Sequence, residues 1–417
     1  MRSSAFIKFI LVLTGIYLLN ATGLHSQVID EFPTDSAKFV ETYKEYMEGK
    51  ISEENKSILQ NFIQHWETGK FKPYVRDSII FIANQLLVTN GKREPHFTKM
   101  MSFFIKTDSV LFEDKYFIPF MKSVRYTATW SKRRLSGLIN LMEFTNEFLE
   151  NSGLHVSRTR SWYALSQDHK FIFDTTLKVI YTNTDIKCKF RDDSIHIYNT
   201  SGTYYPFRVH WTGKNGIVTW ERAGYSKDNI YAELNSYSIN MTKAQYKADS
   251  VKFINKLYFE EPVLGKLEEK LIHISNPSGA IYPVFRSYQN LFEIDNIYEN
   301  MDFTGGFTMK GSQFIGSGSE KQEAVIHVRN NDKLFMTVKA QVFILQKAKA
   351  VSRNASVTIH LENDSIYHTG LQFNYLVNSQ EIELTTNDNV LSESVYYNSY
   401  HNVSMKFDRL LWKTSEE

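Results

Sequence analysis

Four of the twelve histidines recur in one short pattern: isoleucine, histidine, an aliphatic residue, any residue and asparagine. They are His196, His273, His327 and His360. Imidazole nitrogens bind metals, so histidines at one kind of strand position could line up as ligands. The flanking aliphatic residues and the asparagine instead favour a strand that ends in a turn, with the histidine facing away from the core. No H-x-H or H-x-x-x-H pair is present, so we expect no metal and no cofactor.

Two tryptophans flank an Asn-Gly pair. Asn215-Gly216 is typical of a two-residue hairpin turn, because both residues accept a positive φ. Such a turn would place Trp211 directly opposite Trp220. Together with Tyr204 and Tyr205, these indoles form a candidate aromatic face for stacking on a sugar ring. Burial as a packing anchor is the commoner arrangement, and we predict it for the two tryptophans.

Three carboxylates, Glu221, Asp228 and Glu233, are candidates for the acid and the nucleophile or base of a glycosidase. Nothing in the sequence determines their separation, and carboxylates at this density are ordinary on a β surface. We therefore expect the chain to hydrolyse no common polysaccharide.

Seven Asp-Ser or Asp-Thr pairs precede an aliphatic residue or a threonine. This pattern resembles the O-glycan acceptor motif of exported proteins in the Bacteroidota. Asp-Ser also caps helices and forms turns ahead of apolar elements, so both interpretations stay open. The candidate acceptors are Ser36, Ser78, Ser109, Thr175, Ser194, Ser250 and Ser365.

Residues 1–26 have the three parts of a signal peptide: Arg2 and Lys8, an apolar run over 9–19, and small residues before the cleavage site. The run is well short of the roughly 20 residues that span a bilayer, and no cysteine follows it for a lipid anchor. We expect a soluble mature chain without a transmembrane helix, exported to the periplasm, the outer membrane surface or the medium.

Charge and cysteine content narrow the functional classes. Removing two of the 48 basic residues with the signal leaves 46, which balance the 46 acidic residues. A neutral chain disfavours nucleic-acid binding, which needs a basic face. Cys188 is the only cysteine, so no internal disulfide is expected and the core must hold the fold.

The apolar period changes along the chain. From 34 to 153 it is helical, and we expect about six helices in a bundle or a stack of helical hairpins. From 157 onward it is close to two, which predicts strands in β domains at 157–262 and 263–417. The predicted fold is therefore α+β by segregation: an N-terminal all-α part, then an antiparallel-rich all-β region with irregular internal repeats.

The repeats are uneven in spacing. Residues 195–206 match residues 272–283 at eight of twelve positions, and the histidine pattern returns at 326 and 359. Because the offsets are unequal, we infer related β units with different insertions and not uniform coils. Gly305-Gly306 and the glycines from 311 to 318 lack nucleotide-binding fingerprints and are interpreted as turns between strands.

The β region also resembles a group of large exported Bacteroidota proteins of unassigned function. The resemblance spans nearly the whole mature chain and implies that it is the N-terminal part of such a protein. His368-Thr369-Gly370 departs from the His-Pro-Gly of the pattern, and the resemblance implies no catalytic residues. The matching segments are 201–206, 211–216, 218–224, 248–251, 303–307, 314–318, 364–368 and 400–401.

The leading functional hypothesis is a non-catalytic envelope or surface protein with a scaffolding or adhesion role. Its partners would be other envelope proteins or surface glycans. One alternative is a carbohydrate-binding module or glycoside hydrolase, which needs an acidic and aromatic cleft. A second is a periplasmic lipid-carrying β groove, which needs an open apolar interior.

Overall fold

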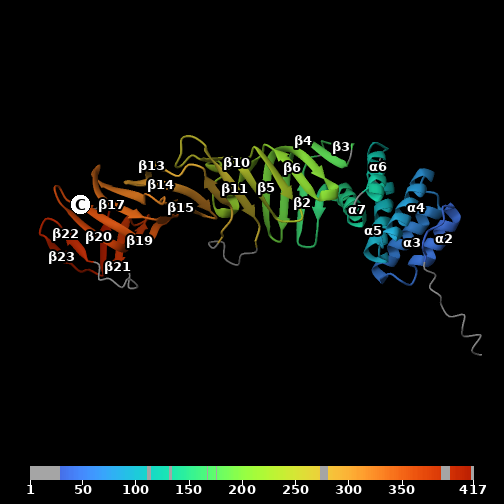
Figure 1. Ribbon diagram of the computed structural model, residues 1–417, viewed down its shortest axis with the longest axis horizontal. Coiled ribbons are helices and arrows are strands. Elements are labelled where there is room, and N and C mark those ends of the chain that lie inside the picture. The colour runs from blue at the N-terminus through green and yellow to red at the C-terminus, as the bar shows by residue number, and fades with distance from the viewer. Residues whose placement is uncertain are drawn as a thin grey trace, which may run out of the picture. The chain divides into compact units, whose positions relative to one another are not determined.

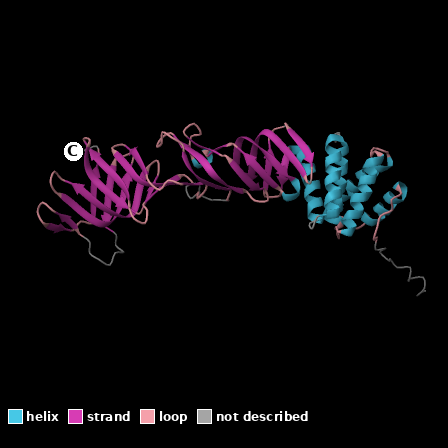
Figure 2. Ribbon diagram, turned by 45° about the horizontal axis from the view of Figure 1, so that its top comes forward, coloured by secondary structure: helices cyan, strands magenta, loops and turns pink. Residues whose placement is uncertain are grey.

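The computed structural model describes residues 29–109, 114–130, 134–166, 168–174, 176–272, 280–386 and 395–414, so the predicted signal peptide lies outside the described residues. Helices come first and strands follow, which confirms the predicted fold class and the six helices (Figures 1 and 2). The helices are α2 (Ser36–Met47), α3 (Glu53–Glu67), α4 (Pro73–Val88), the π-helical turn η1 (Arg93–Phe97), α5 (Thr98–Ser109), α6 (Asp114–Trp130) and α7 (Arg134–Asn151).

Local signals set the helix starts, and aromatic side chains hold the first helices together. The Asp35 carboxylate accepts a hydrogen bond from the backbone N–H of Lys38 at 2.9 Å and caps α2. Phe39 on α2 lies 4.9 Å from the Trp66 ring of α3, between ring centroids. Both rings are buried, so the apolar stripe of each helix faces the other.

The chain divides into two compact units, one of residues 1–112 with 128–139 and one of residues 113–127 with 140–417. Most of α6 and the C-terminal part of α7 therefore belong with the strands. The predicted helical segment 34–153 is shared between the two units. None of the described helices is long and apolar enough to cross a membrane.

The first half of the β region begins directly after α7. Its strands are β1 (Gly153–Val156), β2 (Arg160–Ala164), β3 (His169–Phe173), β4 (Leu177–Phe190), β5 (Asp193–Tyr205), β6 (His210–Lys214), β7 (Ile217–Thr219), β8 (Ile230–Glu233), β9 (Ser236–Asn240), β10 (Gln245–Asn255) and β11 (Val263–Lys270). Two short 3₁₀ turns, η2 (Pro206–Arg208) and η3 (Glu221–Ala223), interrupt them.

The second half continues the same antiparallel ladder. Its strands are β12 (Val284–Ser287), β13 (Phe292–Tyr298), β14 (Met301–Lys310), β15 (Gln313–Ser317), β16 (Ala324–Asn330), β17 (Lys333–Ala340), β18 (Val342–Leu345), β19 (Lys349–His360), β20 (Ser365–Leu376), β21 (Glu381–Thr386), β22 (Tyr396–Asn398), β23 (Val403–Met405) and β24 (Arg409–Lys413). Because β11 pairs with both β10 and β12, the ladder runs through the predicted division at 262–263.

In several places two short strands lie one after the other along a single neighbouring strand, with a break between them. β6 and β7 both lie along β5, and β9 and β8 lie along them in turn. Residues with positive φ mark these breaks, namely Asn199 at 52°, Asn215 at 58° and Ser250 at 53°. Such bulges bend a strand and increase its twist.

The bends bring two parts of the sheet onto a common core. In β4, Val179 before the break and Ile186 after it are both fully buried. The indole N–H of Trp162 on β2 donates to the carbonyl of Lys243, in the turn after β9, at 3.1 Å. β4, β5 and β6 separate these segments within the sheet, so the contact shows that the sheet folds over itself.

The glycine-rich stretch differs from the prediction. Gly305-Gly306 lies inside β14 and Gly316 inside β15. A Cβ at Gly305 would come within 2.7 Å of the Phe303 ring, and one at Gly316 within 2.5 Å. These strand glycines therefore make room for an aromatic core residue, whereas Gly311, with φ of 60°, forms the predicted turn.

Of the four copies of the histidine pattern, the one at 326–330 has the predicted structure, a strand that ends at the asparagine with its histidine facing away from the core. β16 ends at Asn330, and His327 is half-exposed between buried neighbours. β5 instead continues past Asn199, so that asparagine forms a bulge and not a turn. β19 ends at His360 as predicted, but the following Leu361 is 40% exposed. The copy at 272–276 lies outside the described residues from 273 onward.

Candidate functional site

Most of the predicted aromatic face is inside the core. Trp211 and Trp220 are fully buried, as the packing-anchor interpretation requires, and Tyr204 is 1% exposed. Only Tyr205 is partly exposed. A sugar platform must present its ring faces to solvent, so these four residues do not form one.

The predicted pairing of Trp211 with Trp220 is wrong. Trp211 lies between Tyr204 of β5 and Ile239 of β9, while β6 and β7 run end to end. Asn215-Gly216 forms the break between them, and the Asn215 N–H donates to a carbonyl beside β9 at 2.7 Å. The positive φ that suits a hairpin turn also suits a bulge, and pairing along β5 selects the bulge.

Trp220 belongs to a buried polar cluster. Its indole N–H donates to the Glu269 carboxylate at 2.7 Å, and the Arg222 guanidinium contacts the same carboxylate. Arg222 also donates to Asp193 at 3.2 Å. Burial raises the pKa of Glu269 above its ordinary value, while Arg222 and the indole oppose the rise. Because Glu269 is 2% exposed, its carboxylate is not accessible to a substrate, whereas Arg222 and Asp193 reach the surface.

The acidic set does not form a glycosidase pair. The register of β7 with β8 places Glu233 opposite Ile217, four positions before Glu221. Glu221 itself lies in the turn η3, and the groups that shift its pKa include neither Asp228 nor Glu233. Glu221 is exposed, and a hydrogen bond from Thr219 lowers its pKa. Asp228 is exposed in the turn before β8.

The candidate O-glycan acceptors differ in accessibility. Ser250 is exposed at its bulge. Ser36, Ser194 and Ser365 are half-buried, and the Ser194 hydroxyl lies 3.2 Å from the His196 ring nitrogen Nε2. Ser78 is 5% exposed and its hydroxyl donates to the carbonyl of Tyr74, so it is inaccessible in the folded chain. The Ser109 side chain and Thr175 lie outside the described residues.

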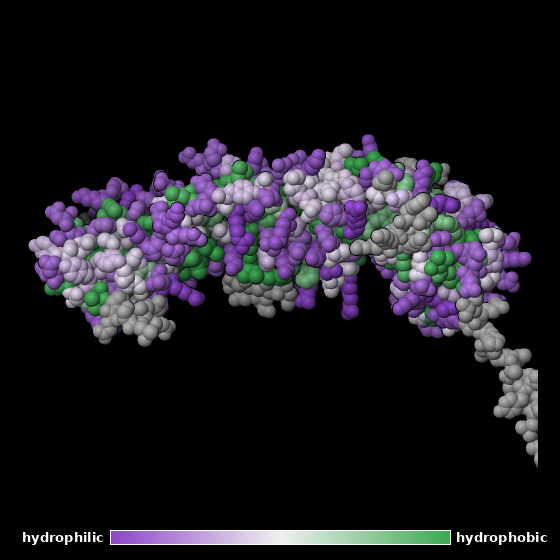
Figure 3. Space-filling model, in the orientation of Figure 1, coloured by the Kyte–Doolittle hydropathy of each residue, from purple (hydrophilic) through white to green (hydrophobic). Residues whose placement is uncertain are grey.

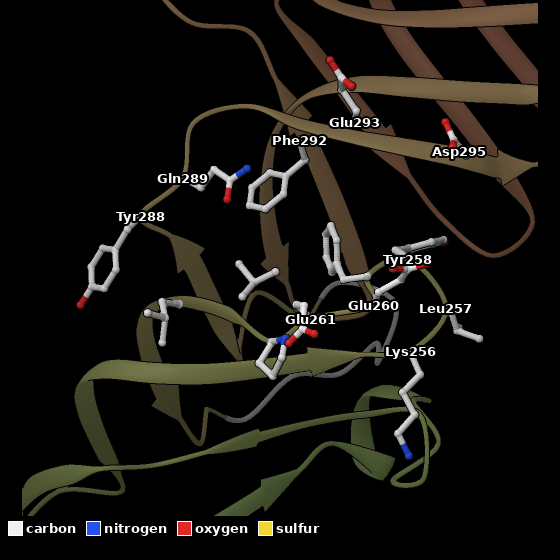
Figure 4. Close-up of a pocket in the computed structure, with 14 residues that line it drawn as sticks. Lys256, Leu257, Tyr258, Glu260, Glu261, Tyr288, Gln289, Phe292, Glu293 and Asp295 are labelled. Atoms are coloured by element: carbon white, nitrogen blue, oxygen red, sulfur yellow. The ribbon is translucent and has the colours of Figure 1, made fainter.

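A different surface has the features of a binding site. A hollow of about 820 Å³ lies between the loop 256–262, which joins β10 to β11, and the segment 288–295, which leads into β13 (Figure 4). In this view the Phe292 ring points from β13 toward the loop, and the Tyr288 ring points away from it. We call this hollow the β13 groove.

Aromatic rings form the floor of the β13 groove. Phe259 of the loop lies 5.2 Å from Phe292 and 5.0 Å from Phe307, between ring centroids. Backbone hydrogen bonds fix the loop, because the N–H of Phe259 donates to the carbonyl of Asn255 at 2.9 Å. The Asn255 side chain, itself 1% exposed, accepts from the N–H of Leu257 at 3.1 Å. The floor is thus a packed and rigid support.

Exposed apolar and exposed acidic side chains both line the rim. Leu257 is 61% exposed, Leu264 51% and Tyr288 44%. Figure 3 shows that apolar residues also lie among polar ones elsewhere on one face of the β region. Of the described residues that line the groove, Lys256 alone is basic and four are acidic. These are Glu260, Glu261, Glu293 and Asp295.

Sequence reasoning missed this groove because its parts lie far apart in the chain and carry no motif. The loop was interpreted only as the approach to a domain boundary at Pro262. The described residues include no group of three or more histidine, cysteine or acidic side chains placed to hold a metal ion.

No protein-family model, curated protein or solved structure matches this chain. The geometry of the chain itself therefore carries the functional argument.

Proposed function

We propose that the chain is exported and acts as a non-catalytic envelope or surface protein with a scaffolding or adhesion role, and that the β13 groove is its binding site. The signal-peptide pattern of residues 1–26 supports export. The observation that carries the binding role is the pair of exposed leucines at this hollow, Leu257 and Leu264, beside a rigid aromatic floor. Apolar side chains exposed beside such a floor are typical of protein interaction sites.

The alternative functions have weaker support in the same geometry. Three of the four residues of the predicted sugar platform are buried, and the groups that shift the pKa of Glu221 include neither Asp228 nor Glu233. Large rings, among them Trp162 and Tyr181, fill the interior of the folded sheet where a lipid groove would need open space.

We expect Leu264→Glu to release the chain from the envelope of the cells that produce it. The change places a charge in the apolar rim, and loss of a central apolar contact weakens an interface by about fivefold or more. The measurement is the fraction of chain that sediments with the envelope after cell breakage. Leu334→Glu, at a residue of similar exposure on β17, is the matched control and should leave that fraction unchanged.

Equal retention of both variants would contradict the role of the groove. Recovery of the unaltered chain inside the cell, with the signal segment still attached, would contradict export itself.

A further inference from the structure

Among the described residues, the strand that borders the groove has one edge without a strand partner. β13 pairs there with β14 alone, through Phe292 with Gly305 and Ile294 with Phe303. β12, which precedes β13 and also lies along β14, pairs with β11 on its other side. The ladder between β11 and β12 ends at Gly265 and Ser287, so no strand in the described part of the chain continues beside β13 on that side. The loop 256–262 occupies the region beyond it, across the groove.

Four other strands among the described residues also have a single strand partner, and they differ in their surroundings. β3 is covered by helices, since Phe171 lies 5.3 Å from Phe148 of α7 and Phe173 lies 6.2 Å from Tyr126 of α6. β24 is five residues long and carries positive charge at both ends, from Arg409 and Lys413, whereas the charges of β13 are negative. β1 and β23 are only four and three residues long. β13 is seven residues long, with a bulge at Asn296 after its first four residues, and it borders the groove.

The side chains of β13 alternate in a way that specifies what could pair with it. Phe292 and Ile294 are buried, whereas Glu293 and Asp295 are exposed on the opposite face. Residues of an added strand that lie beside the two carboxylates would gain most from positive charge, because opposite charges attract across neighbouring strands. Residues on the other face would meet Phe259 and the rim leucines, which favours apolar side chains.

The loop across the groove adds to the same charge preference. Glu260 and Glu261 are both exposed there, so the negative rim lies on both sides of the hollow. An extended segment placed between them would be flanked by carboxylates while its backbone faced the free edge of β13.

From this geometry we propose that β13 accepts an added strand from a partner protein, and that the strand is an extended segment in which lysine or arginine alternates with apolar residues. This inference rests on the proposed function, because it specifies how the β13 groove recognises its partner. Backbone hydrogen bonds to the free edge would supply affinity, and the alternating side chains would supply specificity.

The test uses the purified chain and a fluorescent peptide of sequence Lys-Leu-Lys-Phe-Lys-Leu-Lys. Two further peptides separate backbone pairing from simple charge attraction. One has the same residues in blocks, and the other is methylated on alternate backbone nitrogens, which removes strand hydrogen bonds without changing charge. We expect both to bind at least about tenfold more weakly than the alternating peptide.

A charge reversal in the chain tests the predicted contacts. Glu293→Lys with Asp295→Lys should weaken binding of the lysine peptide by about tenfold and allow binding of a Glu-Leu-Glu-Phe-Glu-Leu-Glu peptide. Glu320→Lys with Glu362→Lys gives the same change of net charge at exposed sites outside β13 and should leave both affinities unchanged. Circular dichroism of each variant checks that it is folded.

Equal binding of the methylated and unmethylated peptides would overturn strand addition, and so would an equal effect of the two double variants. Absence of peptide binding would also overturn strand addition. The same holds if the groove is instead found to form a dimer contact or to bind a glycan. The proposed envelope role would survive any of these results if Leu264→Glu still released the chain, so the two failures are distinguishable.

Discussion

Replacing Trp220 with alanine should lower the free energy of unfolding of the β-rich unit by about 4 kcal/mol. The indole is fully buried against Phe253, with 6.0 Å between ring centroids, and its removal leaves a large cavity. The change also removes the N–H that donates to the Glu269 carboxylate, which leaves part of that buried group unpaired. Urea unfolding followed by circular dichroism measures the loss.

Tyr400→Ala is the matched control for this change. Its ring is 67% exposed, so its removal should change stability by less than about 0.5 kcal/mol. A stable Trp220→Ala chain would contradict the packing role. Loss of glycan binding in that stable variant would restore the sugar-platform interpretation.

Replacing Arg222 with methionine should cost about 3 kcal/mol at neutral pH. The guanidinium is the cation that contacts Glu269, and a buried carboxylate left without its partner is strongly destabilising. The Arg222 side chain is 24% exposed, so solvent screens part of the interaction and we expect the lower end of the usual range. Adding Glu269→Gln to this variant should restore most of the stability, because a neutral amide can still accept the Trp220 N–H.

The loss of stability in Arg222→Met should depend on pH. Because burial raises the pKa of Glu269 above its ordinary 4.5, its contribution to stability is fully present below that value and is lost as pH rises through the folded-state pKa. Removing Arg222 raises this pKa further, so Arg222→Met should be least harmful near pH 4 and most harmful at neutral pH. A loss that is equal at all pH values, or a double variant as unstable as the single one, would contradict this account of the cluster.

The division into helices and strands could be predicted because it depends on local apolar periodicity. Phe39 and Tyr43 repeat at helical spacing on α2, while Ile195 and Ile197 alternate with polar residues on β5, and all four are buried. Such patterns show which face of a helix or strand is buried, but they do not show which other element packs against that face.

The bulge at Asn215-Gly216 could not be predicted from its own residues. A positive φ is needed in both a hairpin turn and a bulge. The bulge is held by a residue of β5, because the Thr200 hydroxyl donates to the Asn215 carbonyl at 3.0 Å.

The β13 groove could not be predicted either, because it also depends on contacts between residues that are distant in the sequence. Its loop is held by contacts distant in the sequence, such as Tyr258 with Phe314 at 5.6 Å between ring centroids, and the ladder of β11 with β12 stops at Gly265 and Ser287, before β13.

Backbone amide exchange at β13 shows directly whether a partner binds along this strand. Hydrogen exchange of the purified chain would be compared with exchange in the presence of envelope material from the producing cells. We expect amides of residues 292–298 and 256–262 to exchange at least about tenfold more slowly with envelope present, while those of the neighbouring β14 change little. Unchanged exchange at β13, with protection gained at β24 or on the helices, would show that the chain binds its partner through another surface.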